Sequence, residues 1–223
     1  MTTLARRVRK SRGIEKVQPN TNPVYCIGKR VFDVVFSLAV LLLLAPLLAL
    51  VALAIKIEDP KGRVFYVQTR VGRYRRPFRC YKFRSMIVEA EDVKERRVKV
   101  NGIDGLVLKM RSDPRVTRVG AVIRKASIDE LPQFLNVIKG DMSVVGPRPL
   151  VSAEAHRCDT YQRQRELVRP GLTCYWQVSG RSLISFDRRM RMDVQYVADQ
   201  HFWLDMLLIL RTIPAVLSAK GAY

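Results

Sequence analysis

Asp129 and Glu130 are the residues of this chain best suited to chemistry. They lie in the stretch RKASIDELPQFLNVIKGDMSVVGPRP, residues 124–149, at the predicted start of a helix. The pattern also fits a structural role, because Ser127-x-x-Glu130 matches a capping box, in which the two side chains satisfy free backbone N–H groups. Asp129 would then only favour the helix dipole. This stretch alone leaves a catalytic pair and a helix cap equally open.

The surrounding composition is strongly basic. Forty Lys and Arg against twenty Asp and Glu give a net charge of +20 and an isoelectric point near 10.4. Such a charge predicts attraction to nucleic acid, an anionic bilayer or phosphorylated substrates, without choosing among them. The 223 residues suffice for one domain with a core, or one domain plus a membrane element. Four dispersed cysteines without a Cys-x-x-Cys pair predict reduced thiols in a cytosolic compartment.

The absence of several known motifs limits the reactions that this sequence could catalyse. The chain has no Gly-x-Gly dinucleotide loop, Walker sequence, Gly-x-Ser-x-Gly elbow or Asp-x-Asp metal pair. Its two histidines, His156 and His201, are expected to be surface or packed residues. A carboxylate is therefore the best remaining nucleophile, and carboxylates do form covalent phosphoryl intermediates.

Basic residues around the two acids indicate a phosphorylated substrate. Phosphoryl transfer needs cations on the non-bridging oxygens, and the planar fork of arginine suits phosphate. A carboxylate that attacks an anionic group faces repulsion, so Mg²⁺ is expected, held by the neighbouring acid and the substrate's own phosphates. The candidate phosphate contacts are Lys82, Arg84, Arg124, Arg148 and Arg181.

An uncharged apolar run from Val34 to Ile55 belongs in a bilayer. Its length at about 1.5 Å per residue is roughly 33 Å, slightly more than the ~30 Å hydrocarbon core. Pro46 predicts a break, because a mid-helix proline removes a backbone hydrogen bond, and Ser37 is one candidate partner for the freed groups. Residues 1–30 and 56–85 are both rich in Lys and Arg. This symmetry favours two half-helices that enter and leave by the same face over a single kinked span.

The rest of the chain predicts a compact cytosolic unit. Segments 63–72 and 77–86 are rich in aromatic and β-branched residues on either side of a turn, which is typical of a hairpin. Polar, solvated helices are predicted over 88–100 and 157–168. The apolar segment 196–217 fits equally a core helix and a helix lying in the membrane interface.

Ordered blocks carry a resemblance to a known family over nearly the whole chain from Lys29. The blocks are KRVFD at 29–33, the apolar run with its proline, VQTRVG at 67–72, YKFRSM at 81–86, DPRVTRVG at 113–120, SIDELPQFLNVIKGDMSVVGPRP at 127–149, RPGLT at 169–173, WQVSGR at 176–181 and KGAY at 220–223. On these residues the chain resembles the monotopic phosphoglycosyl transferases, also called bacterial sugar transferases. The resemblance implies transfer of a sugar 1-phosphate from a UDP-sugar to a polyprenyl (undecaprenyl) phosphate, with release of UMP, as the first membrane step of a surface polysaccharide or glycoconjugate.

The resemblance also implies roles for individual residues. Asp129 matches the nucleophile that forms a phosphosugar–enzyme intermediate, and Glu130 matches the Mg²⁺ ligand beside it. The basic positions near phosphate or nucleotide are matched by Arg124, Arg148, Lys82, Arg84 and Arg181. The chain departs from the family at Ala45, where Ser often precedes the membrane proline, and at Cys174-Tyr175, where Gly and an apolar residue are common.

The expected fold class is mainly α with a small β-hairpin (α+β), in a monotopic membrane protein with interfacial amphipathic helices. A basic N-terminal arm (1–28) precedes a re-entrant, Pro46-broken membrane helix (29–57) and a cytosolic catalytic domain (58–223). This organisation lacks the multi-span region of longer members. The expected location is the bacterial inner (cytoplasmic) membrane, with the catalytic domain on its cytoplasmic face. Expected partners are UDP-sugar, polyprenyl phosphate and anionic phospholipid, without nucleic acid; homo-oligomerisation stays open.

Two alternatives remain. An ordinary glycosyltransferase would move only the sugar and release a nucleoside diphosphate, although the missing Asp-x-Asp speaks against it. A non-catalytic basic protein that binds membrane or nucleic acid would use Ser127 and Glu130 only as a helix cap. Identifying the released nucleotide distinguishes an ordinary glycosyltransferase from a phosphoglycosyl transferase. Salt-dependent DNA binding without turnover would indicate the non-catalytic basic protein.

Overall fold

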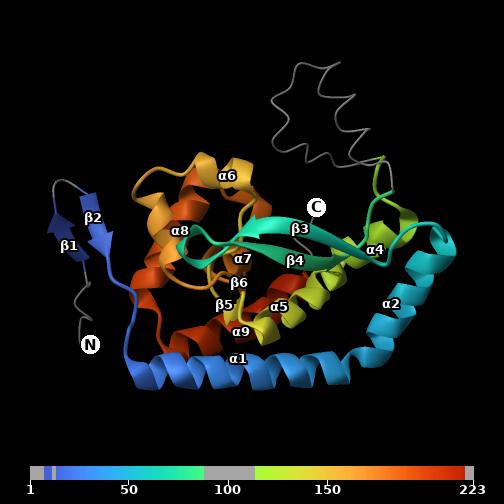
Figure 1. Cartoon of the computed structure of the whole chain (residues 1–223), viewed down its shortest axis with the longest axis horizontal. Helices are drawn as coiled ribbons and strands as arrows, with labels where there is room; N and C mark the ends of the chain where they lie inside the picture. The colour runs from blue at the N-terminus through green and yellow to red at the C-terminus, as the bar shows by residue number, and fades with distance from the viewer. Residues whose placement is uncertain (1–7, 12–13, 88–113, 219–223) are drawn as a thin grey trace, which may run out of the picture.

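The computed structural model describes residues 8–11, 14–87 and 114–218, and this part of the chain is mostly helical (Figure 1). The predicted helix at 88–100 lies outside the described residues. The α-helices are α1 (Pro23–Leu43), α2 (Ala45–Glu58), α4 (Arg118–Lys125), α5 (Phe134–Lys139), α6 (Ser152–His156), α7 (Tyr175–Ser179), α8 (Phe186–Asp199) and α9 (Phe202–Leu217). The 3₁₀ helices are η1 (Arg73–Arg75), η2 (Ile128–Gln133), η3 (Gln162–Leu167) and η4 (Arg181–Leu183). The strands are β1 (Val8–Ser11), β2 (Ile14–Val17), β3 (Phe65–Val71), β4 (Pro77–Phe83), β5 (Ser143–Val145) and β6 (Gly171–Thr173).

The strands form small two-stranded sheets, as the predicted α+β class requires. β3 and β4 pair antiparallel, with Phe65 opposite Phe83, which confirms the predicted hairpin. β5 and β6 pair parallel, and β1 pairs with β2. The hairpin turns through Tyr74 and Arg75, both in the left-handed backbone region. In Figure 1 the hairpin crosses above α5 and brings β4 close to η2.

The apolar run is broken where the sequence predicts. α1 ends at Leu43 and α2 begins at Ala45, with a bend of 62° between them. Pro46 therefore occupies the first turn of α2, where its missing N–H has no helical partner to lose. Helical backbone hydrogen bonds continue on both sides of the break. The predicted role of Ser37 there is wrong, because its hydroxyl donates to the Asp33 carbonyl at 2.6 Å, within α1.

Taken alone, none of the described helices has the length and apolar character needed to cross a membrane, whereas the bent α1–α2 pair passes that test as a unit. α1 begins at Pro23, ahead of the predicted start at residue 29, because the Asn22 side chain accepts the Val24 N–H as an N-cap. The end of the basic arm packs on the body of the protein. Val17 is buried, and its N–H donates to Gln164 Oε1 at 2.6 Å.

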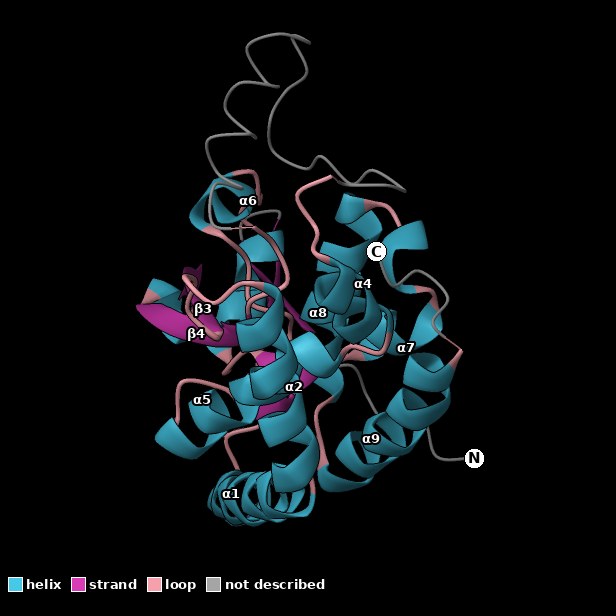
Figure 2. Cartoon of the chain, turned by 90° about the vertical axis from the view of Figure 1, so that its right-hand side faces the viewer, coloured by secondary structure: helices cyan, strands magenta, loops and turns pink. Residues whose placement is uncertain are grey.

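Three charged side chains on the inner face of α1 attach this helix to the rest of the protein. Lys29 Nζ lies 2.8 Å from Asp205 Oδ2, and Asp33 Oδ1 accepts the Val144 N–H at 3.0 Å. Arg30 donates to two carbonyl groups at the end of α5. These bonds fix α1 along α5 and α9, so the two long apolar helices lie side by side at the base of the molecule (Figures 1 and 2).

The segment 196–217 is not one helix. α8 ends at Asp199, and α9 begins after His201, whose Nδ1 accepts the Leu204 N–H at 2.9 Å. The prediction of His201 as a surface or packed residue therefore missed a helix cap. Leu204 and Leu208 are buried in the main hydrophobic core, which confirms the core interpretation for one face of α9. The other face is exposed.

The predicted solvated helix at 157–168 is wrong. Only 162–167 is helical, as the short η3, and Arg165 in it is 4% exposed. The Arg165 guanidinium donates to Asp193 Oδ2 at 2.8 Å, and Trp176 Nε1 donates to Asp193 Oδ1 at 3.1 Å. The pattern of polar and apolar residues does not reveal a buried ion pair. Here such a pair places a polar segment in the core.

We expect Arg165→Met to lower the free energy of unfolding by about 3–5 kcal/mol, because it strands the buried Asp193 carboxylate. The exposed pair Arg191–Asp187 is the matched control, with side chains 69% and 57% exposed. Arg191→Met should cost under about 1 kcal/mol. Thermal unfolding of both variants in the same detergent measures the difference. Equal destabilisation would contradict a structural role for the buried pair.

Candidate active site

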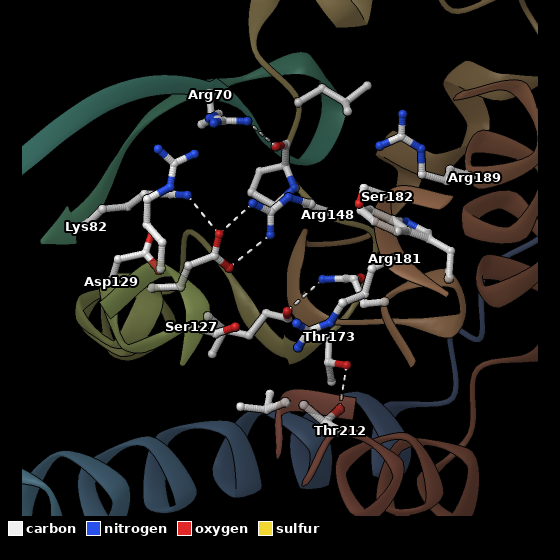
Figure 3. A pocket seen from close by; sticks show the side chains of 18 of the residues that line it. Arg70, Lys82, Ser127, Asp129, Arg148, Thr173, Arg181, Ser182, Arg189 and Thr212 are labelled. Atoms are coloured by element: carbon white, nitrogen blue, oxygen red, sulfur yellow. Dashed lines mark hydrogen bonds and ion pairs between the residues drawn. The ribbon is translucent and has the colours of Figure 1, made fainter. Parts of the chain in front are cut away.

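A cavity of about 580 Å³ opens beside the two acids, between the hairpin, η2 and the segment from α7 to α8. It brings together most of the residues predicted from the sequence (Figure 3). Asp129 and Glu130 line it, and so do Lys82, Arg124, Arg148 and Arg181. Arg84 is not among the lining residues. It lies at the end of α2, with its guanidinium 3.1 Å from Asp59 Oδ2.

The two acids lie on η2, and the capping-box interpretation is wrong. Ser127 adopts a left-handed conformation with φ 58°, and its side chain makes no capping bond. The following residues wind as a 3₁₀ helix through Pro132. Glu130 therefore does not reach back to a helix start, and its carboxylate points into the cavity instead.

Glu130 is bound by two cations from other parts of the chain. Lys82 Nζ, on β4, donates to Oε1 at 2.8 Å, and Arg148 donates to both carboxylate oxygens, to Oε2 at 2.9 Å. Figure 3 shows Lys82 and Arg148 converging from opposite sides. Burial acts to raise the pKa of Glu130, but Arg148 and Lys82 outweigh it and hold that pKa well below its usual range. Glu130 is therefore ionised throughout the physiological range.

Arg148 is held by a loop in which the carbonyl groups from Pro147 onward are bound. In Gly-Pro-Arg-Pro the two prolines have no N–H to satisfy, so the loop presents mainly acceptors. The carbonyls of residues 147–150 accept from Gly171 N, Arg165, Arg70 and Val71 N in turn. A Cβ on Gly171 would lie 2.1 Å from Gly146 N, so only glycine allows the β5 and β6 ends to approach this closely.

Asp129 differs from its neighbour because its carboxylate has no hydrogen-bond partner among the described residues. Burial raises its pKa to about 6, and the charge of Glu130 adds to the rise, while Lys82, Arg148 and Arg124 oppose it. One acid is thus fixed by two cations, and the other is a free carboxylate at the cavity wall. Free lone pairs are what a nucleophile needs.

The cavity also contains buried polar atoms without partners in the described part of the chain. Three are arginine donors: Arg70 Nε, Arg124 Nη1 and Arg189 Nε. The fourth is the acceptor Gln177 Oε1. An unpaired buried donor costs about 1–3 kcal/mol, so its retention at a cavity points to a ligand that pairs with it. The lining therefore suits a large anion with several acceptor oxygens and at least one donor.

Arg181 reaches the cavity from a strained turn. Gly180 has φ 150° and Arg181 has φ 51°, a conformation that residues with a Cβ rarely adopt. Burial lowers the pKa of the Arg181 guanidinium, and the charge of Glu130 opposes that shift. Such strain is typical of functional positions, which is consistent with the predicted contact of Arg181 to substrate.

Several lining residues were not singled out from the sequence. The Arg189 guanidinium lies 5.2 Å from the centre of the Trp176 ring and also faces Phe186. Trp176, Gln177 and Arg70 lie in the blocks WQVSGR and VQTRVG, so the resemblance contained a signal for them. Arg189 lies in the polar run of α8 and gives no such signal, because its function depends on tertiary contacts alone.

The acids are compatible with Mg²⁺ held in part by substrate. Mg²⁺ is commonly bound through one or two carboxylates, with phosphates and water completing its shell. Asp129 is free, and Glu130 Oε2 accepts a single hydrogen bond, so both offer a lone pair. Residues 8–11, 14–87 and 114–218 contain no group of three or more acidic, histidine or cysteine ligands. The residues present therefore suit a shared ion rather than a complete protein cage.

The two acids should affect stability with opposite signs in metal-free buffer. The raised pKa of Asp129 means that its ionisation destabilises the fold as the pH rises from about 4 through 6, so Asp129→Asn should stabilise at pH 7.5 by up to about 3 kcal/mol. The lowered pKa of Glu130 means that its ionised form stabilises the fold above its unfolded-state pKa. Glu130→Gln should therefore lower the stability at pH 7.5. Melting temperatures recorded from pH 4.5 to 8 test both signs, and a stabilising Glu130→Gln would contradict the arrangement.

Comparison with known proteins assigns the chain to a family. The family model described as "Bacterial sugar transferase" matches residues 24–219. The chain is 42% identical over 206 residues to the exopolysaccharide production protein ExoY of Rhizobium meliloti, covering 90% of each. It is 43% identical to the galactosyl transferase CpsE of Streptococcus agalactiae and 42% identical to the undecaprenyl-phosphate galactose phosphotransferase of Salmonella typhimurium. These matches cover 89% and 87% of this chain, but only 44% and 41% of those longer relatives. The chain therefore belongs to the bacterial sugar transferase family and is a sugar-phosphate transferase.

Proposed function

We propose that this chain transfers a sugar 1-phosphate from a UDP-sugar to undecaprenyl phosphate and releases UMP, through a covalent aspartyl intermediate. The carrying observation is the free Asp129 carboxylate beside Glu130, whose charge is fixed by Lys82 and Arg148. Two of the relatives named above include galactose in their names, so UDP-galactose is the first donor to test.

In the first step Asp129 attacks the phosphorus that bears the sugar. An Asp129 oxygen forms the new P–O bond as the bond to the bridging oxygen breaks, and UMP leaves with that oxygen. Lys82, Arg124 and Arg148 lie around the acids and are suited to hold the non-bridging oxygens. The Asp129 pKa of about 6 keeps the nucleophile ionised at neutral pH while leaving it more basic than an ordinary Asp.

In the second step an oxygen of undecaprenyl phosphate attacks the phosphorus of the aspartyl phosphosugar. The Asp129–phosphorus bond breaks, the carboxylate is restored, and the product is a lipid diphosphate sugar. Both steps use the same cations, because the charge develops on the same phosphoryl group. Glu130 and Asp129 would help to hold Mg²⁺, which would supply further neutralisation of the diphosphate.

The proposed acceptor is a lipid, and an apolar face suited to a membrane supports it. Exposed apolar side chains recur every three or four residues along α1, and a second row of exposed apolar side chains follows the outer face of α9. They are Val24, Ile27, Val31, Val35, Leu38 and Leu42 on α1, and Trp203, Leu207, Leu210, Ile213 and Leu217 on α9. Thr212 and Val216 of α9 also line the catalytic cavity. One helix therefore offers both an apolar surface and a wall of the site, as a lipid phosphate acceptor requires.

Within this proposal the α1–α2 pair forms a re-entrant element in the bacterial inner membrane, with the catalytic body on the cytoplasmic side. The 62° bend supports a helix pair that returns to its own face. Anionic phospholipid would be attracted by the net charge of +20.

We expect Asp129→Asn to abolish UMP release from UDP-galactose and undecaprenyl phosphate, because the amide is not a nucleophile. Labelled UMP should also exchange into UDP-sugar without lipid acceptor in the wild type and not in this variant. The nucleotide product is identified by chromatography, and removal of divalent ions with EDTA should stop both reactions. Arg191→Met, outside the cavity, serves as the active control. Release of UDP instead of UMP, or near wild-type turnover by Asp129→Asn, would refute the proposal.

The re-entrant arrangement predicts that both flanks of the helix pair face the same side. Lys16→Cys and Lys61→Cys, made separately in a Cys26→Ser background, place thiols at two exposed positions on either side of it. An impermeant maleimide should label both in inside-out vesicles and neither in right-side-out vesicles. Labelling of the two positions from opposite sides would indicate a single kinked span.

A further inference from the structure

A second cavity, of about 270 Å³, lies at the other end of the protein from the α1–α2 break, where the chain enters α1. The segment before α1, the first turns of α1 and the junction of α8 with α9 contribute to its wall. It shares no lining residue with the catalytic cavity. Its volume is less than half that of the first cavity, which suits a single phosphate group rather than a nucleotide sugar.

The lining of this second cavity is strongly cationic. Lys29, Arg30, Arg73 and Arg169 line it, and Asp33 is its single acidic lining residue among those described. Lys29 is already paired with Asp205. Asp33 is already bound, because its Oδ1 accepts the Val144 N–H.

The three arginines have carbonyl partners but no carboxylate partner within the described part of the chain. Arg30 donates to two α5 carbonyls, Arg169 Nε donates to Gly140 O at 3.0 Å, and Arg73 Nε donates to Leu167 O at 3.1 Å. Carbonyl groups carry only partial charge, so among the described lining residues the Asp33 carboxylate is the one full counter-charge for three guanidinium groups. The two terminal nitrogens of Arg169 have no hydrogen-bond partner among the described residues. These donors have the fork geometry that binds phosphate bidentately.

A buried amide gives an independent indication of a ligand. Gln200, at the end of α8, is 6% exposed and lines the same cavity. Its Nε2 is buried and has no hydrogen-bond partner among the described residues. An anion with several acceptor oxygens would satisfy an orphaned donor in a cavity that three arginines also line.

We propose that this second cavity binds a phosphate group, as a non-catalytic anion site separate from the reaction centre. The first turns of α1 line this cavity and also carry exposed apolar side chains, so a phospholipid headgroup and a soluble phosphate are the two sources of that group. The headgroup source rests on the proposed membrane face, whereas phosphate binding itself does not depend on the proposed phosphoryl transfer.

Cys26 offers a direct readout. It lines the second cavity and is exposed, whereas Cys80, Cys158 and Cys174 are buried. Alkylation of Cys26, followed by intact mass in the full-length protein, therefore reports occupancy of this cavity without any need for turnover. We expect inorganic phosphate in detergent to slow it about threefold at twice the dissociation constant, because one third of the sites then remain open.

Variants separate this cavity from the catalytic one. Arg169→Gln and Gln200→Glu should each abolish protection of Cys26; the second places a carboxylate of nearly the same shape among the arginines and should also raise the melting temperature. Arg148→Gln, in the catalytic cavity, should retain protection, as should the surface control Arg191→Gln. Protection that persists in both Arg169→Gln and Gln200→Glu, or that disappears in Arg148→Gln, would overturn the proposal.

The source of the phosphate group is resolved in nanodiscs. Slower alkylation of Cys26 in phosphatidylglycerol discs than in phosphatidylcholine discs, lost in Gln200→Glu, identifies an anionic headgroup. Protection by added inorganic phosphate in both disc types identifies a soluble anion. Absence of protection by phosphate in detergent and by either lipid would show that the cavity binds neither. UMP release in the same samples tests the catalytic proposal separately.

Discussion

The pairing of Glu130 with Lys82 and Arg148 is the interaction on which the site depends. It joins β4, η2 and the loop after β5 at one carboxylate, so three segments far apart in the chain acquire a fixed geometry. Two unit charges 4 Å apart attract by about 4 kcal/mol at an effective dielectric constant of 20. Two cations on one anion leave a surplus of positive charge beside Asp129. That surplus keeps Asp129 ionisable at neutral pH even though burial and Glu130 both oppose its charge.

The catalytic cavity must also be held in place relative to the exposed apolar face of α1. The charged residues of KRVFD do this, because Lys29, Arg30 and Asp33 bind three different partners and so attach α1 to α5, β5 and α9. α9 in turn carries Thr212, whose hydroxyl lies 2.6 Å from that of Thr173 on β6. A single chain of polar contacts thus connects the exposed apolar helices to the cavity wall. These ionic contacts fix the inner face of α1, whose outer face is exposed in the described part of the chain.

Local signals in the sequence identified features that depend on neighbouring residues. The break at Pro46 and the β3–β4 hairpin follow from spacing and residue type. The same reasoning selected Asp129 and Glu130, which line the first cavity. The sequence could not distinguish a cap from a catalytic pair, because that difference lies in the left-handed Ser127 and in Lys82 and Arg148, far away in the chain. The same limit explains the error over 157–168, where Arg165 is polar in sequence and buried by Asp193, and the position of Arg84, which pairs with Asp59 and does not line the cavity. Ion pairs between residues far apart in the chain leave no periodic pattern in the sequence.

Net charge alone does not determine what each cluster of cations does. In the catalytic cavity the arginines and Lys82 surround two carboxylates, one bound and one free, so the cluster contains a group able to react. In the second cavity Asp33, the only acidic lining residue among those described, is already bound to backbone, and arginines and an orphaned amide share the lining. Under the two proposals, a phosphate group that enters the first cavity meets a nucleophile, whereas one that enters the second meets arginine and amide donors. The same residue types would then support transfer at one site and retention at the other, and the position of a single unpaired carboxylate would make the difference.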